Sequence, residues 1–162
     1  MRPFALLSLT AALLAVSPAL AQNAGQISKA RAGASCPGCN LFQADFASAQ
    51  LTGRNYAGAR LRQADMSAAV MTGVSFAGAD LRDVEAYGAV FTNANFARAN
   101  LTNASFVGTY LHGANFGGAN LDGVNFSGAE LGRAVGLTQA QLSHACGDEA
   151  TELPRGLRIK SC

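Results

Sequence analysis

A large apolar residue recurs at every fifth position along most of this chain. From Leu41 to Leu131 each of these positions holds Leu, Phe, Met or Tyr, with Ala86 as the sole exception, and nothing interrupts the spacing. A period of five matches neither the 3.6 residues per turn of an α-helix nor the alternation of a β-strand. A fixed period of this kind indicates a supersecondary unit that repeats in space, so the sequence predicts a solenoid.

Each large apolar residue is accompanied by a small residue that is also expected to point into the coil. The residue two places before each large apolar residue is mostly Ala, and Val occurs there as Val74, Val84 and Val124. Because polar residues and Gly separate these two positions, we expect a narrow coil with two inward residues on each side. Arg54 holds one of the small inward positions, and since an unpaired charge is rarely buried, the first coil is expected to be distorted there.

The five-residue units follow the pattern A(D/N)LXX, for example ADFAS at 44–48, ANLTN at 99–103 and ANLDG at 119–123. With these units the chain resembles the pentapeptide-repeat family over residues 39–133. The resemblance implies an all-β solenoid, a right-handed quadrilateral β-helix with four units per coil and a short strand on each side. The units then make about four and three-quarter coils, and we place the solenoid at residues 36–135.

Four units per coil predict that large inward residues twenty positions apart stack on one another. Two of the resulting columns are rich in Leu and the other two carry most of the aromatic residues. Ala86 interrupts an aromatic column, but Phe91 and Val84 in the same coil are larger than the usual residues at their positions. We therefore expect the volume of the core to be conserved through that coil.

The first residues have the composition of an export signal. A basic residue, an apolar run over 4–16 and Pro18 precede the small residues Ala19 and Ala21. This order predicts a signal peptide at 1–21, cleaved after Ala21, and no membrane span in the mature chain. Residues 22–35 lack periodicity and are expected to form a flexible leader. The mature protein is therefore expected to be secreted or periplasmic.

Both ends of a solenoid need caps, because terminal coils expose strand edges and core. At the C-terminus the predicted cap covers residues 136–162 and begins with a short helix. Thr138 and Gln141 have the spacing of a capping box at the start of this helix.

Four cysteines in an exported chain indicate two disulfides. Cys36 and Cys39 precede the repeats, whereas Cys146 and Cys162 follow them. The two pairs would cap opposite ends of a rod roughly 20 Å long, well beyond the reach of about 7 Å between disulfide-bonded Cα atoms. We therefore expect Cys36 to bond to Cys39 and Cys146 to bond to Cys162.

The sequence contains few motifs that are typical of catalytic sites. The CPGC motif at 36–39 has the spacing of a redox pair, so a thiol-disulfide function is an alternative, although a polar leader precedes it and repeats follow it. His112 and His144 are solitary, and no phosphate loop or Ser-His-Asp arrangement is present. We expect a non-enzymatic protein without a cofactor or metal.

An acidic column is expected on one side of the coil. Asp45, Asp65 and Glu85 are spaced by twenty residues, which places like charges about 5 Å apart. Arg62 and Arg82 on the neighbouring side, together with Arg60, are expected to offset these charges. A cation site is the alternative interpretation.

A cluster of apolar residues is expected at one corner of the coil. We call this set the apolar edge, and it comprises Val70, Tyr87, Val90, Val107 and Tyr110. All five occupy outward positions, where the rest of the repeats carry mainly Asn, Ser, Thr and Gly. Exposed patches of this kind often mark protein contacts.

The sequence thus favours a non-enzymatic secreted or periplasmic scaffold that contacts a protein or cell-envelope partner, with self-association as one form of that contact. The family also contains DNA-mimicking proteins that bind DNA gyrase, which is a further alternative. A net charge of +2 lacks the strong negative field of such a mimic and also indicates no nucleic-acid partner.

Overall fold

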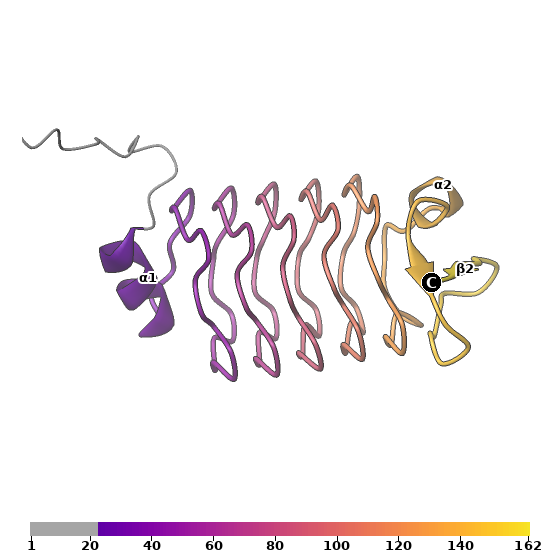
Figure 1. Cartoon of the computed structure of the whole chain (residues 1–162), viewed down its shortest axis with the longest axis horizontal. Coiled ribbons are helices and arrows are strands. Elements are labelled where there is room, and N and C mark those ends of the chain that lie inside the picture. The colour runs from indigo at the N-terminus through magenta and orange to yellow at the C-terminus, as the bar shows by residue number, and fades with distance from the viewer. Residues whose placement is uncertain (1–22) are drawn as a thin grey trace, which may run out of the picture.

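The computed structural model describes residues 23–162, so the predicted signal peptide at 1–21 lies outside the described residues. The described chain forms a rod of stacked coils with a helix at one end and a small cap at the other (Figure 1). Helix α1 (Ala24–Arg31) lies at the N-terminal end. The C-terminal end carries helix α2 (Gln139–Leu142) and the paired strands β1 (Cys146–Gly147) and β2 (Lys160–Ser161).

Parallel bridges join each coil to the next at residues twenty positions apart. The series begins with Asn40 and Arg60, ends with Asn115 and Val135, and includes a bridge on every side of each coil. Four five-residue units therefore make one coil. The expected short strands are reduced to single bridged residues, because each side spends two of its five residues in a turn.

Each corner of the coil is a β-turn whose third residue has a positive φ. At these positions, spaced by five from Gly38 to Gly128, φ lies between 54° and 71°. A backbone hydrogen bond closes the turn, as from Ala44 N to Leu41 O at 3.1 Å. Gly is frequent at the third position because it reaches positive φ without a steric penalty.

Where Asp or Asn precedes a large inward residue, its side chain stabilises the turn that begins at that large residue. The Oδ1 atom of Asp45 accepts a hydrogen bond from the backbone N–H of Ala47 at 3.0 Å, and Asn95 makes the equivalent bond to Ala97. This Asx geometry caps a backbone donor that the turn leaves unpaired. It is the physical reason for the second letter of the repeat.

Large and small inward residues form one continuous buried core along the rod. Phe76, Phe96 and Phe116 stack along one side with ring centroids 5.4 and 5.2 Å apart. Phe91 packs at 5.3 Å from Phe96 and 5.7 Å from Phe106, so its ring occupies space beside the small Ala86. All of these side chains are buried.

Residues 24–31 of the N-terminal leader form helix α1, so the expectation of a flexible leader is wrong for this part of 22–35. Ile27 and Ala30 of α1 are buried against the first coil, and the Tyr56 hydroxyl donates a hydrogen bond to the Ala30 carbonyl at 3.2 Å. The helix forms because the first coil has an apolar end that needs a cover. Arg54 is not buried: it is exposed beside Gly33, where the rod ends.

The C-terminal cap continues the bridging pattern with a changed spacing. Cys146 bridges Asn125, and Glu152 bridges Glu130, so the spacing grows from twenty to 21 and 22 residues. In α2, Thr138 and Gln141 exchange the reciprocal hydrogen bonds of a capping box. The Gln141 side chain also donates to the carbonyls of Phe116 and Ala119, which ties α2 to the last coil.

Candidate interaction edge

The five residues of the apolar edge line one corner of three successive coils. Bridges join Val70 to Val90 and Val90 to Tyr110, and a hydrogen bond from Gly88 N to Val107 O places the Tyr87 turn beside the Val107 turn. Tyr87 is 65% exposed and Tyr110 is 46% exposed, whereas the three valines are half-buried. The tyrosines therefore dominate the surface that this edge presents.

Few other large apolar side chains reach the surface. Among residues 23–162, the exposed large hydrophobic residues are Tyr87, Tyr110 and Val135, and Val135 lies at the end of the last coil. Val70, Val90 and Tyr110 occupy the repeat position that holds Asp or Asn in most other units, so these three positions lack the local hydrogen bond that Asp or Asn makes. The turns remain closed by backbone bonds such as Ala94 N to Phe91 O at 2.9 Å.

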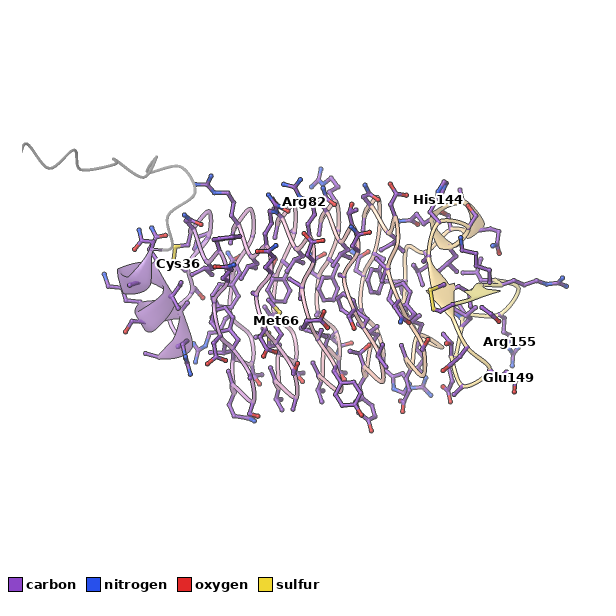
Figure 2. The ribbon with its side chains drawn as sticks, in the orientation of Figure 1. Cys36, Met66, Arg82, His144, Glu149 and Arg155 are labelled. Atoms are coloured by element: carbon purple, nitrogen blue, oxygen red, sulfur yellow. A yellow bond between two sulfur atoms is a disulfide. The ribbon has the colours of Figure 1, made fainter. Side chains whose placement is uncertain are left out.

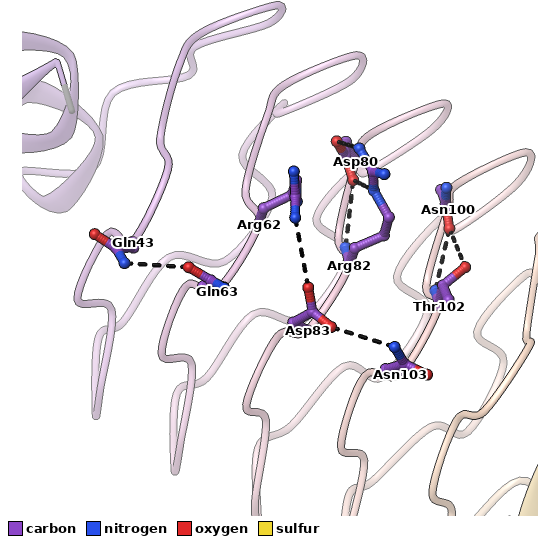
Figure 3. Close-up of polar contacts among 9 residues, drawn as sticks. All are labelled: Gln43, Arg62, Gln63, Asp80, Arg82, Asp83, Asn100, Thr102 and Asn103. Carbon is purple, nitrogen blue, oxygen red and sulfur yellow. Dashed lines mark hydrogen bonds and ion pairs between the residues drawn. The ribbon is translucent and has the colours of Figure 1, made fainter. Parts of the chain in front are cut away.

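The acidic column beside this edge is not offset as the sequence suggested. Arg62 lies 3.8 Å from Asp83, and Arg82 bonds to Asp80 at 2.6 Å, so both guanidinium groups pair with carboxylates outside the column (Figure 3). Asp45 is paired with Arg31 of α1 at 3.0 Å. Within residues 23–162, Asp65 and Glu85 have no ion-pair partner. The expected pairing with Arg62 and Arg82 is therefore wrong.

The ion pair between Arg82 and Asp80 lowers the pKa of Asp80. Hydrogen bonds from the Arg82 side chain hold the pKa of Asp80 below its ordinary value, although partial burial acts in the opposite direction. Because the pKa is lower in the folded chain, the pair stabilises the fold fully above the unfolded pKa of about 4. That stabilisation is lost as the pH falls through the lower, folded-state pKa.

Asp80→Asn should therefore lower the thermal midpoint at pH 7 and have little effect near pH 2. We expect a decrease of roughly 1–3 °C at pH 7, because a partly exposed ion pair contributes at most about 1 kcal/mol. Circular dichroism melts at both pH values measure this. Glu149→Gln, at an exposed residue without an ion-pair partner in the described chain, is the control. An equal decrease at both pH values would contradict the assignment.

The CPGC motif forms a repeat unit of its own. Cys36 N bonds to Asn55 O and Gly38 N bonds to Ala57 O, each at 2.9 Å, so the motif stacks in register on the first coil. Cys36 and Cys39 flank a β-turn with Gly38 at φ 69°, and their sulfur atoms lie at disulfide distance. Cys146 and Cys162 are paired in the same way at the other end. The CPGC pair thus lies at a turn rather than at a helix N-terminus.

The histidines make isolated contacts at the surface. His112 lies 3.4 Å from Glu130, and His144 lies 3.6 Å from Asp122. Figure 2 places His144 beside α2, far along the rod from Cys36. No group of three or more His, Cys, Asp or Glu residues in the described chain is arranged to hold a metal ion. No helix within residues 23–162 is long and apolar enough to cross a membrane.

The profile of a family described as "Pentapeptide repeats" matches residues 57–85 and 89–128 in eight copies. A solved pentapeptide repeat protein from the thylakoid lumen of Arabidopsis thaliana is 30% identical, with a TM-score of 0.64, over 70% of this chain and 81% of that one. No curated protein matches.

Two further solved structures are more distant. HetL from Nostoc sp. PCC 7120, described as involved in heterocyst differentiation regulation, is 24% identical with a TM-score of 0.43, over 79% of this chain and 60% of its own. QnrB1, a plasmid-mediated fluoroquinolone resistance protein, is 20% identical with a TM-score of 0.47, over 76% of each chain. The family profile, the twenty-residue coil and the lumenal relative together make this chain a member of the pentapeptide repeat family.

Proposed function

We propose that this protein is an exported, non-enzymatic scaffold that binds a protein or cell-envelope partner through the apolar edge. The observation that carries the proposal is the exposure of Tyr87 and Tyr110 on a solenoid whose other outward positions are mostly polar. Exposed aromatic side chains on a rigid support are typical of interface anchors, because they bury a large area at a small entropic cost. A solenoid supplies such a support through its stacked coils.

Export is supported by the sequence and by the cysteines. The segment 1–21 has the order of regions that a signal peptide has. All four cysteines lie in pairs at disulfide distance, which suits an oxidising compartment. The Arabidopsis relative resides in the thylakoid lumen, and that location is compatible with export here.

The alternatives have less support. A thiol-disulfide function would use the CPGC motif, but its cysteines flank a turn and lack the helix N-terminus that activates such thiols. A DNA-mimicking function needs a continuous negative field, whereas Arg62 and Arg82 pair with carboxylates on the rod. Neither alternative accounts for the two exposed tyrosines.

Affinity capture from an envelope extract tests the proposal with the mature protein as bait. A Val90→Asp, Tyr110→Asp double variant places charge on the apolar edge. The amount of any specific partner that it captures should be lower by at least about nine-tenths. The matched control is Asn95→Asp, Asn115→Asp, which adds the same charge at the equivalent repeat position on another side. This control should retain the partner.

Equal capture by the wild type and both variants would contradict the use of this edge. If the captured partner is a second copy of the chain, light scattering of the purified protein should show a dimer that the edge variant abolishes. Loss of partner by both variants would show a charge effect unrelated to the edge.

A further inference from the structure

The apolar edge has an acidic border that lacks ion-pair partners within the described chain. Glu85 and Tyr87 stand on either side of the buried Ala86, so both side chains point outward from the same side of the coil. Glu85 bridges Asp65, which places the two exposed carboxylates on adjacent coils. Glu85 therefore lies on the same side of the coil as the exposed Tyr87, and Asp65 lies one coil away from Glu85.

Three neighbouring cations pair with other carboxylates, and Arg60 lies on the adjoining side of the coil, where its backbone bridges Asp80. Arg31 pairs with Asp45, the first carboxylate of the same column, at 3.0 Å. Arg62 and Arg82 contact carboxylates on the adjoining side, as Figure 3 shows. Because like charges on adjacent rungs repel, Asp65 and Glu85 retain an unfavourable interaction that a cation from outside would relieve.

The charge of this surface therefore indicates which charge a binding partner should carry. A Lys or Arg side chain that reaches Asp65 or Glu85 also comes close to the Tyr87 ring, where a cation is attracted to the aromatic face. An acidic surface at this position would add a third negative charge and be repelled. The valines and Tyr110 still require apolar groups opposite them.

We propose that the apolar edge binds a protein segment that carries Lys or Arg beside apolar side chains. This inference rests on the proposed function, since it concerns the same edge. Asp65 and Glu85 select the charge of the partner, and the tyrosines and valines provide the apolar contact. The partner is thus a basic amphipathic segment rather than an acidic one.

Two fluorescein-labelled peptides test this with the full mature chain. One alternates lysine with valine and tyrosine, and the other has glutamate in place of lysine. Fluorescence anisotropy should show binding of the lysine peptide about tenfold tighter than that of the glutamate peptide. Raising the salt concentration should reduce this ratio.

Three variants separate charge from apolar contact. Asp65→Asn, Glu85→Gln should bring the ratio of the two affinities close to one. Asp122→Asn, Glu149→Gln removes the same charge elsewhere on the rod and should leave the ratio unchanged. Val90→Ser, Tyr110→Ser leaves Asp65 and Glu85 unchanged and should weaken the binding of both peptides.

The outcomes distinguish this inference from the proposed function. Equal binding of both peptides by the wild type, weakened by Val90→Ser, Tyr110→Ser, would overturn the charge preference and keep the edge. Binding that is insensitive to Val90→Ser, Tyr110→Ser would contradict the edge itself. Absence of binding of the lysine peptide to the folded wild type would overturn the inference.

Discussion

Phe96→Ala should lower the free energy of unfolding by about 3–5 kcal/mol. The Phe96 ring is buried and stacks between Phe76 and Phe116 at centroid distances of 5.4 and 5.2 Å. It also meets Phe91 and Phe106 edge-on, so its removal leaves a cavity in contact with four rings. Urea unfolding followed by circular dichroism measures the change.

Phe42→Ala is the matched control, because Phe42 is a half-buried residue at an outward repeat position. It should lower the free energy of unfolding by no more than about 1 kcal/mol, since little area leaves water there. Similar losses for the two variants would contradict the assignment of inward and outward positions. A smaller loss for Phe96→Ala than for Phe42→Ala would contradict the coil register as well.

Cys146→Ser, Cys162→Ser should lower the free energy of unfolding by about 3 kcal/mol in the chain-entropy model. The pair joins residues separated by 16 in sequence and holds the C-terminal tail, including β2, against β1. Thermal and urea unfolding of the oxidised protein measure the difference. A reducing agent should bring the wild type close to the variant with all four cysteines replaced.

Cys36→Ser, Cys39→Ser is the comparison, and the same model gives about 2 kcal/mol because the bridged residues are separated by only three. An oxidised wild type that is no more stable than the Cys146→Ser, Cys162→Ser variant would contradict the stabilisation assigned to the C-terminal disulfide. Free thiol titration of the unfolded protein provides an independent check on both pairs.

The five-residue period and the resemblance to the pentapeptide-repeat family together were sufficient to predict how the repeats are arranged in space. The coil of four units that the resemblance implied predicted the stacking of residues twenty apart, and the bridges keep that spacing from Asn40 to Val135. It also predicted that Phe91 compensates for Ala86. The short strands on each side did not appear, because a turn takes two of the five residues on each side and only one residue is bridged.

Parts of the chain without periodicity were harder to predict. Helix α1 follows no repeat, and it is held by contacts with the first coil, such as Gln26 Oε1 accepting from Asn40 N at 2.7 Å. The partners of Arg62 and Arg82 depended on side-chain reach around a corner, which spacing alone does not specify. The exposure of Tyr87 and Tyr110 followed from the register, but their partner lies outside the chain.

Photo-crosslinking in cells shows whether the apolar edge contacts a partner. Benzoylphenylalanine in place of Tyr87 samples the apolar edge, and the same residue in place of Ala97 samples the equivalent repeat position on another side. We expect a specific crosslinked species at position 87 that is absent at position 97 and is lost with Val90→Asp, Tyr110→Asp. Crosslinks of equal yield at both positions, or only at 97, would contradict it.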